Sequence, residues 1–159
     1  MNHTPEENLE KLGITVPEAT EPVATYVNLV RVGNLLFMSG KGPLKSYDTY
    51  VTGKLGKDLN IEEGYEAARL TAICHIAVLK TELGNLSRVK RIVKVLGMVN
   101  CIDEFTEQPK VINGYSDLMV SVFEEKGRHA RSAVGINALP MNIAVEVEVI
   151  VEIEEQETN

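Results

Sequence analysis

The last quarter of the chain alternates apolar and polar side chains with a period of two residues. From Ile143 to Ile153 every odd position is Ile or Val, and the even positions include Glu146, Glu148 and Glu152. A period of two over this length places one face of a β-strand in a hydrophobic core and leaves the other face polar. The end of the chain therefore predicts a long strand in a sheet that is buried on one face.

A second alternating run, residues 131–138, precedes this strand and is separated from it by the turn-like residues 139–142. Two such runs joined by a short connection predict a β-hairpin. Arg131 then belongs to the non-core face, beside the small residues Ala133 and Gly135 and on the same side as the glutamates of the last strand. A fixed guanidinium above small side chains predicts a site for a small anion.

The remainder of the chain predicts three helices, two strands, a loop and a β-rich stretch. They are expected as a helix over 4–12, strands over 26–32 and 35–39, a long loop or irregular strand over 41–58, a helix over 60–83, a β-rich stretch over 91–102 and a helix over 109–126. The order β-β-α-β-α-β-β predicts an α+β domain, with two helices packed on one face of a single mixed sheet. We expect residues 1–25 to form an N-terminal extension with a short helix and residues 26–155 to form the domain.

Two helices can cover only one face of this sheet, so the other face needs a different partner. We expect that face to carry charged, small and apolar side chains together: Arg131, Ala133, Gly135, Glu146 and either Leu36 with Met38 or Leu35 with Phe37. A mixture of this kind suits a subunit interface better than open water. The sequence therefore predicts an oligomer.

Composition argues against several classes of function. The net charge of −7 opposes generic binding to nucleic acid, which depends on Lys and Arg side chains that neutralise phosphates. No apolar run has the length of a membrane span, and the acidic, polar N-terminus differs from a signal peptide. Cys74 and Cys101 have no disulfide-framework spacing, which predicts free thiols in a reducing cytoplasm.

The sequence offers no metal or cofactor motif. His3, His75 and His129 lack the spacing of metal ligands, and no phosphate-binding loop, dinucleotide fingerprint or Ser-His-Asp pattern occurs. We expect His75 on the flank of its helix. His129 is expected either in a surface loop or beside the cleft near Arg131.

Several short motifs, in order, resemble one known family. They are Tyr26-Val27, the stretch from Val32 to Ser39-Gly40, Ala130-Arg131-Ser132, Leu139-Pro140 and Val145-Glu146-Val147-Glu148. Together they resemble the RidA/YjgF family of enamine and imine deaminases, often labelled L-PSP endoribonucleases, in a longer bacterial-type branch. The resemblance spans residues 26–153. It implies a chorismate-mutase-like fold and a homotrimer with clefts between its subunits.

The resemblance also implies two catalytic residues. Arg131 matches the arginine that holds the substrate carboxylate, and Glu146, fifteen residues later, matches the glutamate that positions water. In the predicted hairpin Glu146 lies opposite about Gly135, so the two side chains are roughly 13 Å apart in one subunit. They would then meet only across an interface. The alternative for Arg131 is a cross-strand or inter-subunit ion pair with Glu146 or Glu148.

By the same resemblance, five further residues are candidates for substrate binding: Tyr26, Ser39, Gly40, Asn113 and Ala133. Tyr26 would form a wall of the cleft, Ser39 would lie near the substrate, and Gly40 would expose its backbone there. Asn113 corresponds to a family asparagine early in the second long helix, although the Asn113-to-Tyr115 spacing is one residue short. The alternatives are an ordinary strand tyrosine, a turn serine and a solvated helical asparagine.

Two positions depart from the family pattern. Ala133 replaces a common cysteine, which removes a thiol but keeps the backbone carbonyl, and Lys41 replaces a common glutamine and is expected to add positive charge at the cleft entrance. Three functions follow. The first is a C=N hydrolase that releases a 2-keto acid and ammonia without a cofactor. The second is a non-catalytic binder of small carboxylate metabolites or a regulator of a partner enzyme, and the third is an endoribonuclease or translation inhibitor, which the acidic charge opposes.

Overall fold

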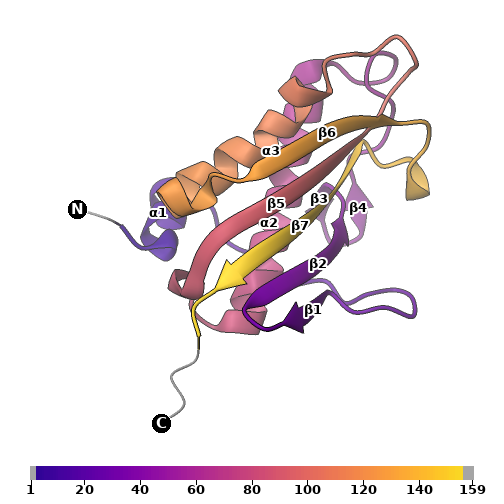
Figure 1. Cartoon of the computed structure of the whole chain (residues 1–159). Helices are drawn as coiled ribbons and strands as arrows, with labels where there is room; N and C mark the ends of the chain where they lie inside the picture. Colours follow the sequence, from indigo (N-terminus) through magenta and orange to yellow (C-terminus); the bar gives the residue numbers. More distant parts are fainter. Residues whose placement is uncertain (1–2, 156–159) are drawn as a thin grey trace.

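A five-stranded mixed sheet with strand order β1-β2-β7-β5-β6 carries two helices on one face (Figure 1). The structure is a computed structural model and describes residues 3–155. The sheet consists of β1 (Leu29–Val32), β2 (Leu35–Lys41), β5 (Val89–Asn100), β6 (Ala130–Ile136) and β7 (Val145–Ile153), and the helices are α2 (Ile61–Leu83) and α3 (Gln108–Phe123). The predicted α+β class, with two helices on one face, is confirmed.

Smaller elements surround this framework. A short helix α1 (Pro5–Lys11) packs against α3, and β3 (Leu44–Ser46) pairs with β4 (Thr49–Tyr50) inside the segment expected to be irregular. Three 3₁₀ turns span Leu86–Arg88, Glu124–Gly127 and Pro140–Asn142. None of the helices within residues 3–155 combines the length and apolar character needed to cross a membrane.

Local chemistry fixes the limits of α2 and its distance from α3. At the predicted capping box, the Asn60 side chain accepts from the Glu63 backbone N–H at 2.9 Å, and the Glu63 carboxylate accepts from the Asn60 N–H at 2.8 Å. The helix ends at Gly84, whose φ is 71°. Gly114 allows α3 to lie directly on α2, because a Cβ there would be 1.9 Å from the Tyr65 carbonyl oxygen.

The predicted hairpin between β6 and β7 is wrong, because β5 lies between these two strands. β6 pairs with β5 in parallel, whereas β7 is antiparallel to both β5 and β2. The 3₁₀ turn Pro140–Asn142 carries the chain over the end of β5 (Figure 1). There the buried Asn100 donates to the Ile143 carbonyl at 3.1 Å. The turn residues were recognised from the sequence, but a short connection can also pass over a strand end.

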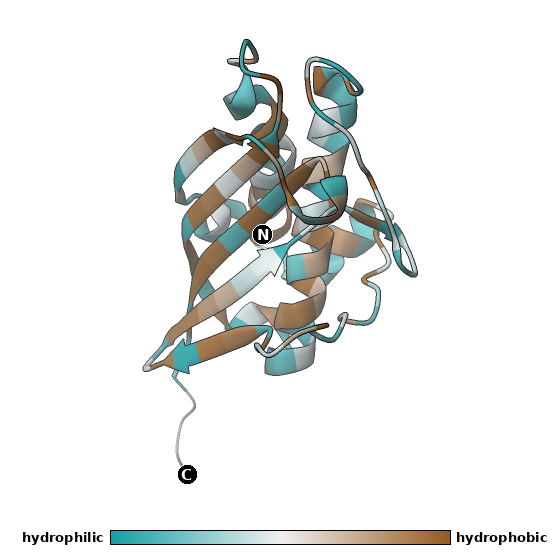
Figure 2. Cartoon of the chain, turned by 90° about the vertical axis from the view of Figure 1, so that its right-hand side faces the viewer, coloured by the Kyte–Doolittle hydropathy of each residue, from teal (hydrophilic) through white to brown (hydrophobic). Residues whose placement is uncertain are grey.

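The alternation in β7 orients the whole sheet. Its odd residues from Val145 to Ile153 are buried toward the helices, and its even residues face the other side, as predicted. In β2 the buried pair is Leu36 and Met38, so Phe37 lies on the open face with 43% of its surface exposed. The register gives the open face further apolar residues: Val30, Val32, Leu35, Leu96, Met98, Val134 and Ile150. Apolar bands on the strands alternate with polar ones in Figure 2.

Candidate functional site

Arg131 lies on β6, at one edge of the sheet, and its guanidinium contacts α3. Nη1 donates to Asn113 Oδ1 at 2.9 Å and to Ser116 Oγ at 3.1 Å. Nη2 makes a longer contact of 3.5 Å with the Pro109 carbonyl oxygen. The first turns of α3 therefore hold one end of the guanidinium by neutral acceptors.

The expected orientation of Arg131 is wrong, because the odd residues of β6 face the helices. A Cβ on Gly135 would lie 2.9 Å from both Cys101 Sγ and Gln108 Nε2, which places Gly135 against the start of α3. Ser132, by contrast, accepts from Lys94 Nζ at 3.2 Å on the open face. Arg131 and the glutamates of β7 therefore lie on opposite faces. The polar side chains of α3 make this burial of an arginine possible at the sheet edge.

His129 orients the Ser116 hydroxyl that contacts Arg131. His129 Nδ1 lies 2.7 Å from the Gly127 carbonyl oxygen, which only accepts, so Nδ1 carries the proton. His129 Nε2 then accepts from the Ser116 hydroxyl at 2.9 Å, while the same oxygen accepts from Arg131. Burial lowers the pKa of His129, and the charge of Arg131 acts in the same direction. His129 thus lies beside the Arg131 site and keeps Ser116 in the orientation that receives the guanidinium.

The remaining edge of the Arg131 guanidinium is available to a ligand. Asn113 and Ser116 use both hydrogens of Nη1, whereas Nε donates to no acceptor within residues 3–155. Within the same residues no carboxylate lies within ion-pair distance of Arg131. The predicted alternative of an ion pair with Glu146 or Glu148 is therefore not formed inside one chain. A carboxylate fits such a fork of parallel N–H donors.

A second group of candidate residues lies around an irregularity in β2. Met38 pairs with Val149 and Lys41 with Val147, so Ser39 and Gly40 oppose a single residue of β7. A Cβ on Gly40 would lie 3.0 Å from Glu146 Cδ, which places the glutamate against the Gly40 backbone.

Glu146 is half-buried on the open face of the sheet, and its environment disfavours the charged form. Burial raises the pKa of its carboxyl group, and the like charge of Glu148 raises it further. A carboxylate with a raised pKa is a stronger base than one in water. Glu146 therefore has the properties of a proton acceptor.

The loop that contains Tyr26 borders the same group. Tyr26 lies in a bend before β1, although a strand was expected to begin there, and 49% of its surface is exposed. Ser39 Oγ donates to the Val27 carbonyl at 2.6 Å, and Lys41 Nζ donates to Asn28 Oδ1 at 2.6 Å and to Thr20 Oγ1 at 3.2 Å. Lys41 thus holds the loop in place, and burial lowers its pKa.

One chain does not bring Arg131 and Glu146 together. Arg131 pairs with Val95 of β5, whereas Glu146 pairs with Met98, which is also the partner of Val134. Glu146 is therefore level with Val134, with β5 between them, and does not lie directly opposite Gly135 as predicted. Three residues along the strands and two strand spacings give about 14 Å between the two Cα atoms. The residues also belong to opposite faces. Ser39, Gly40 and Glu146 form one group, and Arg131, Asn113 and Ala133 form the other. Tyr26 lies in the adjoining loop, where it lines a pocket together with residues of α2.

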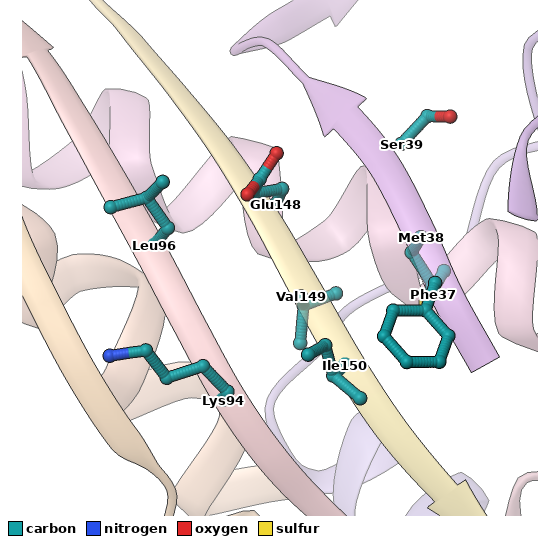
Figure 3. A pocket seen from close by; sticks show the side chains of 8 residues that line it. All are labelled: Phe37, Met38, Ser39, Lys94, Leu96, Glu148, Val149 and Ile150. Carbon is teal, nitrogen blue, oxygen red and sulfur yellow. The ribbon is translucent and has the colours of Figure 1, made fainter. Parts of the chain in front are cut away.

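A depression of about 340 Å³ occupies the middle of the open face. Its lining includes Phe37, Ser39, Lys94, Leu96, Glu148 and Ile150, whose side chains extend from three neighbouring strands (Figure 3). The Ser39 hydroxyl points away from the others, toward the loop that it binds (Figure 3). The depression therefore belongs to the apolar sheet face and contains only one of the predicted site residues.

His75 is a buried residue whose position was mispredicted. It has no exposed surface, Nε2 lies 3.0 Å from the Ser39 carbonyl oxygen, and Nδ1 lies 2.8 Å from the Tyr115 hydroxyl. Burial lowers its pKa from 6.5 to about 4. The spacing could have indicated this burial, because His75 follows Ala72 by three residues and precedes Leu79 by four, and both belong to the apolar face of α2.

No cluster of three or more His, Cys, Asp or Glu side chains suited to a metal ion occurs between residues 3 and 155. Cys74 and Cys101 are both free and buried. The candidate residues themselves offer a guanidinium, a carboxylate, hydroxyl groups, an amide and backbone groups.

Comparison with known proteins identifies relatives over nearly the whole chain. Residues 6–153 match the family model described as "YjgF/chorismate mutase-like, putative endoribonuclease". Protein TCP17 of Trypanosoma cruzi is 47% identical over 147 residues, which are 92% of each chain. The crystal structure of Atu1372 from Agrobacterium tumefaciens, of unknown function, is 44% identical with a TM-score of 0.88, covering 94% of this chain and 92% of that one. A structure from Shewanella oneidensis, named as a putative endoribonuclease, is 35% identical with a TM-score of 0.91, covering 95% and 100%.

Proposed function

Because the chain belongs to the RidA/YjgF family, we propose that it hydrolyses reactive enamino or imino acids to a 2-keto acid and ammonia. The observation that supports this most directly is the geometry of Arg131. Asn113 and Ser116 hold one nitrogen of its guanidinium, no carboxylate of the described chain neutralises it, and its other edge is available. Such an arginine suits the carboxylate of an amino acid derivative.

Glu146 is the proposed base. An enamino acid first tautomerises to the imine, as a proton moves from nitrogen to carbon. Water then adds to the electrophilic C=N carbon, and the carboxylate of Glu146 takes a proton from that water as the C–O bond forms. The nitrogen gains protons and leaves as ammonia when the C–N bond breaks, and the new C=O bond yields the keto acid. Burial and the charge of Glu148, which raise the pKa of Glu146, favour this proton transfer. The Gly40 backbone next to it lets a planar substrate approach.

We further propose that each site forms between copies of the chain in a homotrimer. Glu146 lies beside β2 with Ser39 and Gly40, and Tyr26 lies in the loop before β1, whereas Arg131 lies on β6 at the opposite edge of the sheet. An interface that joins the β6 edge of one copy to the open face of the next would unite the two groups. It would also cover the exposed apolar residues of that face, such as Phe37 and Val134.

A second candidate function is the binding of small carboxylates without turnover. The observation in its favour is Ala133, two residues after Arg131, whose methyl side chain leaves only backbone polar atoms where many relatives are expected to have a thiol. Endoribonuclease activity, which the description of the matching family and the name of the Shewanella oneidensis structure suggest, is a third candidate. The net charge of −7 opposes it.

A single assay separates these functions. 2-Aminoacrylate would be generated in situ, and pyruvate release followed with wild type, Arg131→Ala and Arg128→Ala. Arg128 is a matched control because it lies three residues away and forms an ion pair with Glu125 at the surface. We expect faster release with wild type and Arg128→Ala, and the spontaneous rate with Arg131→Ala. Equal rates for all samples, together with pyruvate binding that depends on Arg131, would support the binding function instead.

A further inference from the structure

The bulge of β2 is supported from the core by a histidine that the proposed reaction does not use. At this bulge Ser39 and Gly40 oppose one residue of β7, so the strand cannot pair there in the regular way. His75 lies on α2, directly beneath, and its Nε2 is 3.0 Å from the Ser39 carbonyl oxygen. A helix side chain therefore supplies a hydrogen bond to the irregular part of the strand.

The hydrogen bonds of His75 fix its tautomer. The Ser39 carbonyl can only accept, so Nε2 carries the hydrogen, and Nδ1 must accept from the Tyr115 hydroxyl at 2.8 Å. Both side chains are fully buried, and their rings meet edge to face with centroids 5.7 Å apart. The result is a series of hydrogen bonds from Tyr115 on α3 through His75 on α2 to Ser39 on β2, in which each donor has one acceptor.

This series of hydrogen bonds ends at Ser39, one residue from the contact between Gly40 and Glu146. Because a Cβ on Gly40 would already lie 3.0 Å from Glu146 Cδ, small displacements of the bulge alter the space around the carboxylate. His75 and Tyr115 are closed to solvent, and an apolar side chain in place of His75 would leave the Tyr115 hydroxyl and the Ser39 carbonyl without their partner. The imidazole ring is therefore suited to determine both how far the bulge lies from α2 and how its peptide groups are oriented.

We propose that His75, held by Tyr115, is a positioning residue that fixes the Ser39–Gly40 bulge against Glu146. Its catalytic meaning rests on the proposed deaminase function, but the placement of the bulge does not. The substrate clamp at Arg131 belongs to the opposite edge of the sheet. Loss of His75 should therefore affect the water-activating side of the site and spare the carboxylate-binding side.

The test compares His75→Leu, His75→Gln and Tyr115→Phe with Ile76→Ala in the full-length protein. Ile76 is the adjacent, fully buried residue of α2, and its side chain cannot form hydrogen bonds, so it controls for lost stability. The first measurement is the amide resonance of Gly40 in a ¹H–¹⁵N spectrum. The second is the division of imine hydrolysis between kcat and KM.

We expect His75→Leu and Tyr115→Phe to shift the Gly40 resonance and to lower kcat about tenfold at little-changed KM. His75→Gln, which can still donate to Ser39, should recover part of both effects, and Ile76→Ala should leave the resonance in place. Tyr115→Phe removes only a hydroxyl group from the core, so it still tests the proposal if His75→Leu fails to fold. An unmoved Gly40 resonance in Tyr115→Phe, with kinetics equal to those of Ile76→Ala, overturns the proposal. An inactive wild type refutes the deaminase function alone, because the resonance still reports the position of the bulge.

Discussion

Gly40 and Glu146 touch across two neighbouring strands, so that even a methyl group on Gly40 would meet the carboxylate. A Cβ there would lie 3.0 Å from Glu146 Cδ and 3.2 Å from its Oε2. The contact keeps the carboxylate half-buried, and Gly40 has no side chain of its own to cover the backbone beside it. The proposed chemistry therefore depends on a small space between two residues that are distant in sequence.

Substitution of this glycine should impair catalysis more than folding. The backbone of Gly40 is outside the left-handed region, so alanine causes no backbone strain there. The added methyl group must instead displace Glu146. We expect Gly40→Ala to lower kcat about tenfold with a thermal midpoint close to that of wild type. Steady-state kinetics and calorimetry check this, and an unchanged kcat would show that the position of Glu146 is not critical.

Arg131 should not be replaceable by lysine. Lysine keeps the charge and has three N–H donors, but it lacks the planar fork that binds Asn113 and Ser116 through one nitrogen while its other edge offers parallel N–H groups to a ligand. We expect Arg131→Lys to weaken pyruvate binding by about tenfold or more, measured by titration calorimetry. Ser116→Ala should weaken it less, because Asn113 still holds the guanidinium. Wild-type affinity in Arg131→Lys would exclude a bidentate contact.

The pH profile of the reaction should report Glu146. Burial and Glu148 raise the pKa of this carboxyl group, and the base must be deprotonated to accept a proton from water. The rate should therefore fall as the pH decreases through that raised pKa. Glu148→Gln removes the like charge and should move the acid limb to lower pH. If the acid limb of the pH–rate profile does not move in Glu148→Gln, the group that titrates there is not Glu146.

His75 should make the protein less stable in mild acid. Its pKa is about 4 in the folded chain and 6.5 when unfolded, so the unfolded chain binds the proton first as the pH falls. The stabilisation is complete above pH 6.5, is lost progressively between pH 6.5 and about 4, and amounts to about 3 kcal/mol. Urea unfolding of wild type and His75→Gln at several pH values isolates this contribution. Parallel curves for the two proteins would contradict it.

Local patterns predicted individual elements well. The alternation of β7 and the capping box of α2 depend on residues close together in the sequence, and both occur as expected. Local patterns do not predict which strand pairs with which. β6 and β7 are separated by a short connection, yet β5, which comes earlier in the chain, lies between them. Nothing in the two alternating runs themselves distinguishes a hairpin from a crossover.

The functional roles of the candidate residues stay predictions, and their arrangement was predicted only in part. Arg131 and Glu146 were identified through motifs, whereas the face of β6 was inverted because Val134 and Ile136 were assigned to the core. Those two apolar residues instead lie on the open face of the sheet, where the proposed interface would cover them. A single chain sequence does not distinguish an apolar residue of the core from one of an interface.

The central claim is that Arg131 and Glu146 act together although they belong to different copies of the chain. Arg131→Ala and Glu146→Gln should each be inactive alone. After the two variants are unfolded, mixed in equal amounts and refolded together, random assembly should place both intact residues at some interfaces and restore about one quarter of the wild-type rate of pyruvate release. Restoration at that level supports a site shared between copies. A mixture that stays inactive, while mixtures of each variant with wild type keep their expected rates, would contradict it.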